Sequence, residues 1–370
     1  MKYLKPLIAA LVTALPLVLT GCGGDNVSTE QRLDALVADI MAKEAPPGMI
    51  LGVWTPTMTY LKAVGVADIP SGAPMSTDMN YRIGSQSKMY IATVILQMVD
   101  EGKITLEDKV AKHITGVTDG EKITIFQLIT NTSGIPSYSE DAAWMKALFA
   151  DPTRVWAPWE LVEVSNKIKH PFDPGKGWHY SNTNFVILGL IAEAIDHQPV
   201  EDILYQRLSK PLGLRVTSLP LGTALPPPSP HGYYESGEKG APRLADYTVQ
   251  SPSWGWTAGG MLGNVAESKA WIEAAVGGGL LSDAMQAKRM STWVDAQTGA
   301  PGATSGYGMG IGNRDGVIGH TGSLPGWTSG AYRIVDRDAT VVFFFNLQSE
   351  VSDPAARLLA EVTDIVRAAP

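Results

Sequence analysis

The chain has 370 residues and a formal net charge of −8, with 45% hydrophobic and 18% charged residues. This composition is typical of a globular protein, and the length allows one large domain or two packed lobes. An acidic chain with a single cysteine is not expected to bind nucleic acid, to contain an internal disulfide framework or to hold a multi-cysteine metal site.

The N-terminal segment has the features of an export signal. Lys2 and Lys5 precede an apolar stretch from Leu7 to Leu19, which is too short to span a membrane comfortably. The stretch ends in Leu19-Thr20-Gly21-Cys22, which resembles the lipobox of bacterial lipoproteins, where the signal is cut before a cysteine that is then lipidated. The alternative is an ordinary signal peptide with a bystander cysteine.

The only cysteine of the chain falls at the position that a lipobox requires. We therefore expect residues 1–21 to be a lipoprotein signal peptide, Cys22 to be the lipidation site and residues 22–29 to be a lipidated tether. The protein would be exported and anchored by lipid to the bacterial cell envelope, facing the periplasm or sorted to the outer membrane if there are two membranes.

The remaining chain shows helical and strand periodicity in turn. Ser28 and Gln31 form a capping-box pattern before a helical run of apolar residues, and Thr124 with Gln127 forms a second one. The predicted elements, in chain order, are a helix after Ser28, strands at 49–54 and 60–66, a helix from 85 to about 102, a short helix from 124 to about 134, helices at 184–195 and 200–208, a proline-rich loop at 220–230, strands at 316–321, 330–335 and 340–345, and a last helix at 354–368.

Strands near both ends with helices between them predict an α+β fold. In this arrangement an antiparallel sheet is built from both termini, and helices flank it as in an α/β/α sandwich. We expect one domain over residues 30–370, with a helical region at about 86–250 inserted between the two halves of the sheet.

Motifs of metal and nucleotide sites are absent from the sequence. The six histidines show neither H-E-x-x-H nor a paired spacing, so a zinc site is not expected. The G-x-S-x-G motif of α/β-hydrolases and the P-loop motif do not occur either. The pattern S-x-x-K does occur, at Ser85 to Lys88 and at Ser236 to Lys239.

The two S-x-x-K copies differ in context. Ser236 lies in a glycine-rich segment without an apolar period, which predicts a loop. Ser85 opens a predicted helix, so Lys88 lies one turn further along the same face, with its amine near the hydroxyl. A lysine with a lowered pKa can act as the base that a serine nucleophile needs, and a helix N-terminus favours a developing oxyanion. The alternative is a capping serine followed by an exposed lysine.

Two further motifs follow Ser85 in order. Tyr180-Ser181-Asn182 is a Y-x-N before a predicted helix, and His320-Thr321-Gly322 is an H-x-G at the end of a predicted strand. With these three motifs the chain resembles the serine penicillin-recognising enzymes, and within them the D-alanyl-D-alanine carboxypeptidase and class C β-lactamase branch. The flanking segments YRIGSQSK (81–88), ITIFQLITNTSG (123–134), YSNTNFVILG (180–189), KPLGL (210–214), AGGML (258–262) and GHTGSLPG (319–326) agree with that branch, and the resemblance covers about residues 30–365.

The resemblance implies roles for three catalytic residues. Ser85 would be the nucleophile that forms an acyl-enzyme, and Lys88 would be its proton partner. Tyr180 would pass a proton to the leaving amine and later activate water. How Lys88 and Tyr180 divide the role of base is left open by the sequence.

The resemblance also implies substrate-binding residues. Asn182 would bind the substrate amide and orient Lys88, and the backbone N–H groups of Ser85 and Ser323 would form the oxyanion hole. His320 and Thr321 would border the site and contact the substrate carboxylate. The chemistry needs no metal or organic cofactor.

Two departures from the family pattern affect the expected specificity. Many β-lactamases and penicillin-binding proteins have K-T-G where this chain has His320, and an imidazole is a weaker and pH-dependent carboxylate anchor. Related carboxypeptidases often have a basic residue after the segment that corresponds to 306–312, and Arg314 is the nearby candidate here.

We therefore expect an exported serine hydrolase that acts on small peptides or esters, with D-alanyl-D-alanine carboxypeptidase-like activity as the first choice. An esterase of the β-lactamase family and a penicillin-binding sensor whose acyl-enzyme does not turn over are the alternatives. The expected partners are the substrate and, through the lipid, a membrane; the physiological substrate and the oligomeric state stay open.

Overall fold

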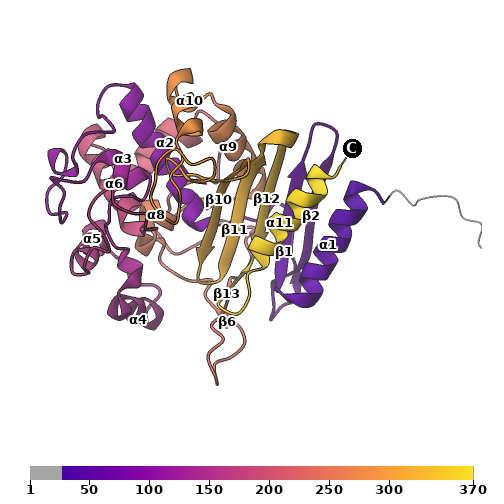
Figure 1. Cartoon of the computed structure of the whole chain (residues 1–370). Coiled ribbons are helices and arrows are strands. Elements are labelled where there is room, and N and C mark those ends of the chain that lie inside the picture. Colours follow the sequence, from indigo (N-terminus) through magenta and orange to yellow (C-terminus); the bar gives the residue numbers. More distant parts are fainter. Residues whose placement is uncertain (1–26, 370) are drawn as a thin grey trace, which may run out of the picture.

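An eight-stranded antiparallel sheet forms the centre of the computed structural model, which describes residues 27–369 (Figure 1). The strand order is β3-β2-β1-β12-β11-β10-β9-β8. Strand β1 near the N-terminus pairs with β12 near the C-terminus, which confirms that both ends of the chain build the sheet. The strands are β1 (Gly48–Trp54), β2 (Thr59–Asp68), β3 (Ala73–Pro74), β8 (Gly306–Tyr307), β9 (Gly312–Arg314), β10 (Val317–Leu324), β11 (Trp327–Ile334) and β12 (Ala339–Phe345).

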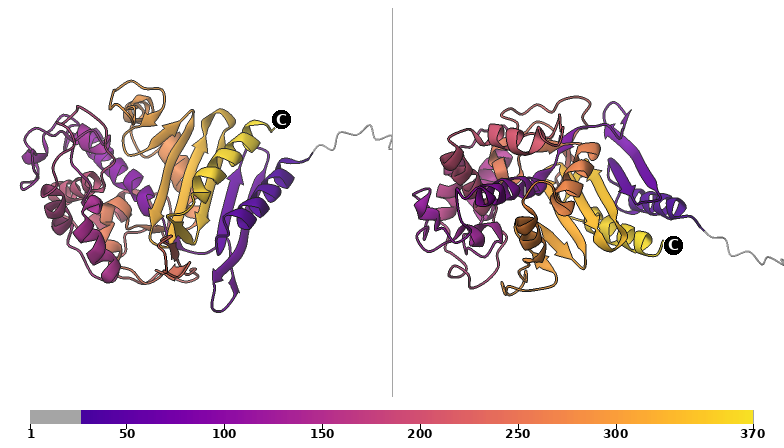
Figure 2. Two further views of the ribbon diagram at one scale, coloured as in Figure 1. Left: turned by 60° about the horizontal axis from the view of Figure 1, so that its bottom comes forward. Right: turned by 90° about the horizontal axis from the view of Figure 1, so that it is seen from above.

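Helices α1 (Thr29–Lys43) and α11 (Pro354–Arg367) lie side by side on one face of the sheet (Figures 1 and 2). Ser28 Oγ accepts a hydrogen bond from Gln31 N and Gln31 Oε1 accepts one from Ser28 N, so the predicted capping box is present. The apolar side chains of both helices pack on β1 and β12 and form a core of their own. Arg357 of α11 pairs with Asp39 and Glu44, which joins the two terminal segments.

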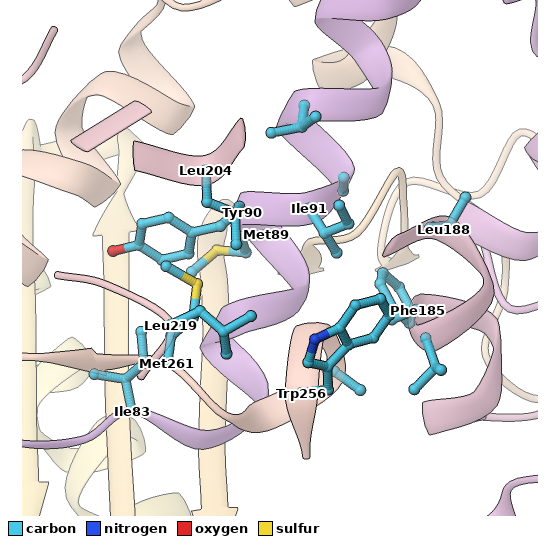
Figure 3. Close-up of a cluster of buried hydrophobic side chains, with 14 of the residues drawn as sticks. Ile83, Met89, Tyr90, Ile91, Phe185, Leu188, Leu204, Leu219, Trp256 and Met261 are labelled. Atoms are coloured by element: carbon cyan, nitrogen blue, oxygen red, sulfur yellow. The ribbon is translucent and has the colours of Figure 1, made fainter. Parts of the chain in front are cut away.

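The opposite face of the sheet is covered by α9 (Val265–Gly277) and by a helical region. Helix α2 (Ser87–Asp100) is buried over most of its surface, because other helices surround it, and its side chains form the centre of the larger core (Figure 3). The remaining helices are α3 (Ile125–Ile129), α4 (Ala142–Ala150), α5 (Pro158–Asn166), α6 (Asn182–Asp196), α7 (Val200–Leu204), α8 (Trp256–Gly259) and α10 (Asp283–Ser291). This arrangement is the expected α+β sandwich.

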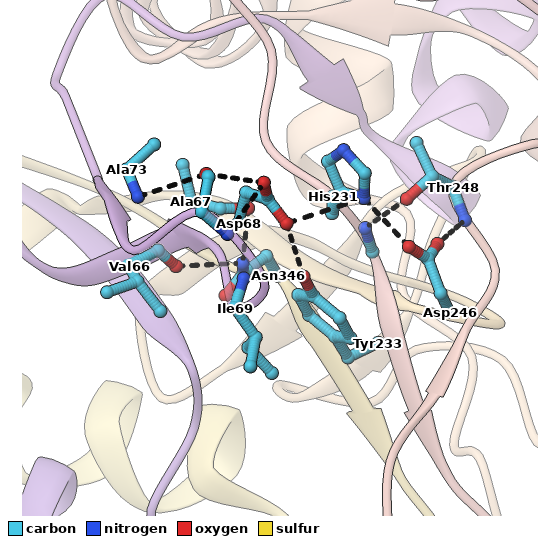
Figure 4. A network of polar contacts seen from close by, with 12 residues as sticks. Val66, Ala67, Asp68, Ile69, Ala73, His231, Tyr233, Asp246, Thr248 and Asn346 are labelled. Atoms are coloured by element: carbon cyan, nitrogen blue, oxygen red, sulfur yellow. Dashed lines mark hydrogen bonds and ion pairs between the residues drawn. The ribbon is translucent and has the colours of Figure 1, made fainter.

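Two small sheets connect the helical region to the main sheet. Strand β4 (Tyr81–Arg82) pairs with β7 (Leu262–Gly263), and β13 (Leu347–Ser349) pairs with β5 (Tyr233–Glu235), which also pairs with β6 (Ala245–Asp246). A polar network lies where β2, β5 and β6 meet (Figure 4). There, His231 Nδ1 is 2.7 Å from an oxygen of Asp246, and Asn346 Nδ2 donates to Val66 O.

Several boundaries differ from the sequence expectation. The short helix that starts after Thr124 ends at Ile129, not near Gly134, because Asn131 adopts a left-handed conformation with φ +61°. Strand β10 continues to Leu324, since it forms a two-residue hairpin with β11, so the H-x-G motif lies inside a strand. Helices α8 to α10 lie between the helical region expected at about 86–250 and strand β8.

The expected signal peptide, the lipidation site Cys22 and most of the tether lie outside the described residues. Within residues 27–369, no helix combines the length and the apolar character needed to cross a membrane.

Candidate active site

Ser85 lies in a short 3-10 turn (Gly84–Gln86) that connects β4 to α2. Gly84 has φ +57°, a conformation that glycine adopts without strain. The hydroxyl of Ser87 donates to Gly84 O and accepts from Met261 N, so the turn is fastened to the segment before β7. The nucleophile predicted from the sequence is thus placed at the start of the buried helix.

The turn packs against β10 at a distance that leaves no room for side chains. A Cβ on Gly322 would lie 1.9 Å from Ile83 O, and a Cβ on Gly84 would lie 2.7 Å from Ser323 N. Gln86 Nε2 donates to Ser329 Oγ, which in turn donates to Ile83 O. Because of these contacts, Ser85 lies beside the third motif, 235 positions later in the chain.

Lys88 is fully buried one helical turn beyond Ser85. Its Nζ lies 3.0 Å from Ser85 Oγ, 2.8 Å from Asn182 Oδ1 and 2.7 Å from Ala258 O. Burial lowers the pKa of the Lys88 ammonium well below its ordinary value. A neutral amine donates its two N–H groups to the two carbonyl-type oxygens, which leaves its lone pair facing the serine hydroxyl.

The Ala258 carbonyl comes from the short helix α8, which packs closely on α6. A Cβ on Gly189 of α6 would lie 2.6 Å from Thr257 Oγ1, and that hydroxyl donates to Phe185 O. The segment at 258–262 was predicted only to match the family pattern, and the role of its first carbonyl was not predicted. A backbone acceptor carries no residue signature, so the motif pattern alone could not have identified it.

Tyr180 and Asn182 complete the group around Lys88. The Tyr180 ring centroid is 4.8 Å from Lys88 Nζ. Burial raises the pKa of the Tyr180 phenol, and its interaction with the Ser85 side chain opposes this rise in part. Asn182 is the first residue of α6, and its Nδ2 donates to Ser139 Oγ at 3.1 Å.

His320 lies on β10 and is 9% exposed. Its Nδ1 is 2.6 Å from Thr321 O, so Nδ1 carries the proton, and Nε2 accepts from the Tyr307 hydroxyl at 3.2 Å. Burial is the main cause that lowers the pKa of His320 to about 3. The imidazole is therefore neutral near pH 7 and offers no positive charge to a carboxylate.

Thr321 and Ser323 are exposed on the same strand. Thr321 Oγ1 is hydrogen-bonded to the Tyr332 hydroxyl. Leu324 and Trp327 close the two-residue hairpin as a hydrogen-bonded pair, so Ser323 belongs to a pair without ladder hydrogen bonds. The N–H of Ser323 therefore points away from β11, on the side of the Ser85 turn.

Two charged residues are candidates for binding a charged group of the substrate. Glu140 is exposed; it follows Ser139, the hydrogen-bond partner of Asn182, and its Oε1 is 2.6 Å from His179 Nε2. Arg314 pairs with Val317, and its backbone is therefore roughly 13 Å along β10 from Thr321. The positive charge of Arg314 nevertheless acts on the phenol of Tyr332.

The second S-x-x-K copy lies apart from these residues. Ser236 and Lys239 belong to the irregular segment between β5 and β6, as expected, and Ser236 Oγ accepts from Glu238 N. No cluster of histidine, cysteine, aspartate or glutamate that could bind a metal ion occurs within residues 27–369.

Comparison with known proteins gives consistent matches over nearly the whole chain. The β-lactamase family model matches residues 33–364. A D-aminopeptidase from Brucella anthropi is 26% identical over 338 residues, which cover 88% of this chain and 61% of that protein, so this chain spans less than two thirds of its length.

Two solved structures extend this comparison. A D-stereospecific amidohydrolase from Streptomyces sp. is 32% identical, with a TM-score of 0.75 and coverage of 86% of this chain and 93% of that chain. The D-amino acid amidase from Ochrobactrum anthropi SV3, complexed with L-phenylalanine amide, is 22% identical and has the same fold, with a TM-score of 0.80 and coverage of 92% and 98%.

Proposed function

This chain is a serine hydrolase of the β-lactamase family, and we propose that it hydrolyses amides of D-amino acids and short peptides with an N-terminal D-residue. In this mechanism Lys88 takes the proton of Ser85 Oγ while that oxygen bonds to the substrate carbonyl carbon. The N–H groups of Ser85 and Ser323 bind the oxyanion. Tyr180 gives its proton to the leaving amine and recovers one from Lys88, and water then hydrolyses the acyl-enzyme.

The observation that carries the serine-hydrolase mechanism is the environment of Lys88. Two of its three contacts, Asn182 Oδ1 and Ala258 O, can only accept hydrogen bonds, and its burial disfavours the charged form. The third contact is Ser85 Oγ, at a distance suited to proton transfer. The raised pKa of Tyr180 keeps its phenol protonated, so the base role belongs to Lys88 and the relay role to Tyr180.

The charges at the site favour an amino group over a carboxylate on the substrate. Lys88 is buried and occupied by its three contacts, and His320 is neutral near pH 7. Glu140 places a negative charge at the rim, which suits the ammonium of a free D-amino acid amide or an N-terminal residue. Preference for the D-configuration is supported by the names of the D-aminopeptidase and the two solved relatives.

Carboxypeptidase-like activity is the second candidate. The positive charge of Arg314 affects the phenol of Tyr332, and the hydroxyl of Tyr332 contacts Thr321. In this second candidate, Arg314 attracts the carboxylate of a substrate that lies beside Thr321 and Tyr332. The two candidates differ in which charged residue they require, Glu140 or Arg314.

The nucleophile is tested with Ser85→Ala. The variant should lose covalent labelling by a fluorescent penicillin and hydrolysis of p-nitrophenyl acetate. Ser236→Ala, in the other S-x-x-K copy, is the matched control and should keep both. Hydrolysis that survives in Ser85→Ala would refute the assignment.

The substrate class is tested with three probes: D-alanine p-nitroanilide, a D-Ala-D-Ala peptide blocked at its N-terminus, and p-nitrophenyl acetate. We expect turnover of the anilide, a rise in its KM of at least tenfold in Glu140→Gln, and no change in Arg314→Ala. Turnover of the blocked peptide alone, lost in Arg314→Ala, would support the carboxypeptidase. Ester turnover alone would indicate the esterase, and a stable acyl adduct without turnover would indicate the sensor.

We also propose that Cys22 is lipidated and anchors the protein to the bacterial cell envelope. The support is the position of the only cysteine after a short apolar segment. Metabolic labelling with palmitate should mark the protein and should fail in Cys22→Ala. An intact mass that matches a mature chain starting at another residue, or starting at an unmodified Cys22, would refute the lipid anchor.

A further inference from the structure

The segment that carries Tyr180 has no regular secondary structure before α6 begins at Asn182. One residue from a distant part of the chain contacts the backbone on both sides of Tyr180. His179 N donates to Asn131 O at 3.0 Å, and Ser181 N donates to Asn131 Oδ1 at 3.2 Å. Asn131 therefore binds the backbone immediately before and immediately after Tyr180.

Asn131 is suited to this double contact by its conformation. It is fully buried and adopts φ +61°, a region that asparagine enters more readily than most residues. Asn184 Nδ2 also donates to Asn131 Oδ1, and Ser133 Oγ donates to Asn184 Oδ1. The side-chain oxygen is thus fixed by two donors from the start of α6.

The other end of the Asn131 amide faces the third motif. Its Nδ2 is buried without a hydrogen-bond partner in bonding distance, but the side chain is close enough to Tyr307 to influence that phenol. The hydroxyl of Tyr307 is hydrogen-bonded to His320 Nε2. The ring of Tyr307 lies edge-on to the ring of Tyr180, with the two centroids 6.2 Å apart. Asn131 consequently lies between the second and third motifs.

We propose that Asn131 is a positioning residue for Tyr180, which keeps the phenol at the distance from Ser85 and Lys88 that proton transfer to the leaving group needs. The inference rests on the proposed function, because it matters only if Tyr180 delivers that proton. Asn131 itself does not touch the reacting atoms. Its effect passes through the two backbone contacts that flank Tyr180.

The role of Tyr180 predicts a specific kinetic signature. An anilide or amide needs a proton on its leaving nitrogen, whereas p-nitrophenolate leaves without one. A displaced Tyr180 should therefore slow acylation by D-alanine p-nitroanilide much more than acylation by p-nitrophenyl acetate. A general loss of packing would slow both reactions alike.

The test compares Asn131→Gly, Asn131→Asp and Tyr180→Phe by the rate of leaving-group release in the acylation phase. Asn131→Gly keeps the left-handed conformation and loses the side chain; we expect a fall of about 10- to 100-fold with the anilide and less than threefold with the ester, with KM unchanged. Asn131→Asp keeps the oxygen that binds Ser181 N, and it should restore the ratio of the two rates to within about threefold of the unmodified protein.

The outcomes separate this inference from the proposed function. Tyr180→Phe should show the same selective loss, larger than that of Asn131→Gly. If Tyr180→Phe shows the selective loss with the anilide but Asn131→Gly shows no loss, or slows the anilide and the ester equally, Asn131 is not a positioning residue. If Tyr180→Phe slows neither or both equally, the proton-relay role of Tyr180 is wrong and the inference fails with it. Activity that survives in Ser85→Ala would refute the proposed function independently.

Discussion

The buried amine of Lys88 shows how single residues gain their chemistry from their surroundings. In water a lysine is protonated at neutral pH, and it cannot act as a base. Here Lys88 is removed from water and meets two oxygens that only accept hydrogen bonds. Burial has the same effect on His320, because removal from water, next to the hydroxyl of Tyr307, favours the neutral imidazole over the charged form.

The role of Lys88 can be tested by removing its lone pair. Lys88→Met fills a similar volume without a base, and we expect acylation by p-nitrophenyl acetate to slow by about 10²- to 10⁴-fold. Lys269→Met is the control, since Lys269 lies on α9 paired with Glu273. A rate in Lys88→Met above one tenth of the original would contradict the assignment.

His320 should make the stability of the protein depend on pH. Its folded-state pKa of about 3 is below the ordinary value of 6.5, so between these values the unfolded chain binds a proton that the folded chain does not. Stability should then fall as the pH drops below 6.5. Between pH 7.5 and pH 5, the unmodified protein should lose about 2 kcal/mol more of its free energy of unfolding than His320→Gln.

Urea denaturation at the two pH values measures this difference. His197→Asn is the control, because His197 is exposed and asparagine tolerates its left-handed conformation. Equal losses in the unmodified protein and in His320→Gln would show that His320 is not buried in its neutral form.

At the scale of elements, the site depends on close contact between the Ser85 turn and strand β10. The contact is possible because Gly84 and Gly322 present no side chains to each other's backbone. The contact brings the N–H of Ser323, which lies on β10, close to Ser85, which lies on the turn.

Gly322→Ala should separate these two elements. The added Cβ would lie 1.9 Å from the Ile83 carbonyl oxygen, so the turn must move. We expect acylation to slow at least tenfold and the free energy of unfolding to fall by about 1–3 kcal/mol. Gly312→Ala on the neighbouring strand, where the nearest atom is 3.4 Å away, is the control and should change acylation little. Full activity in Gly322→Ala would show that catalysis does not depend on the close contact between the Ser85 turn and β10.

At the scale of the whole molecule, two hydrophobic cores lie on opposite faces of one sheet. The larger core surrounds α2 and the site, whereas the smaller one lies under α1 and α11. Stability and catalysis can therefore be changed separately.

Leu358→Ala is expected to show this separation. Leu358 is fully buried in the smaller core, so its truncation should lower the free energy of unfolding by about 2–5 kcal/mol. Acylation by p-nitrophenyl acetate below the unfolding transition should stay within twofold, because the variant leaves the other face intact. Leu359→Ala, at a partly buried position beside it, should cost less stability. A tenfold slower acylation in Leu358→Ala would show that the two faces are coupled.

The predicted elements agree with the structure where local patterns carry enough information. Both capping boxes are present, and the strands and helices near the termini lie close to their expected positions. Strands β8 and β9 were not predicted, because they are two and three residues long and contain glycine, and because they form only by pairing, β9 with β10 and β8 with β9. The left-handed Asn131, which ends α3 early, likewise depends on contacts with the segment at 179–184.

By itself the sequence determined the fold class and the family, and it predicted Ser85, Lys88, Tyr180, Asn182 and His320 as site residues, since the motifs and their order along the chain can be read without the structure. The tertiary structure decided which atoms meet: the Ala258 carbonyl and Asn182 at the amine, Tyr307 at the imidazole, and Asn131 around Tyr180. It also decided the burial of His320, which favours the neutral imidazole, so a substrate carboxylate in contact with His320 would meet no positive charge there. The reason is physical, because burial and hydrogen-bond partners from distant segments set the protonation state of a group, and no local pattern encodes them.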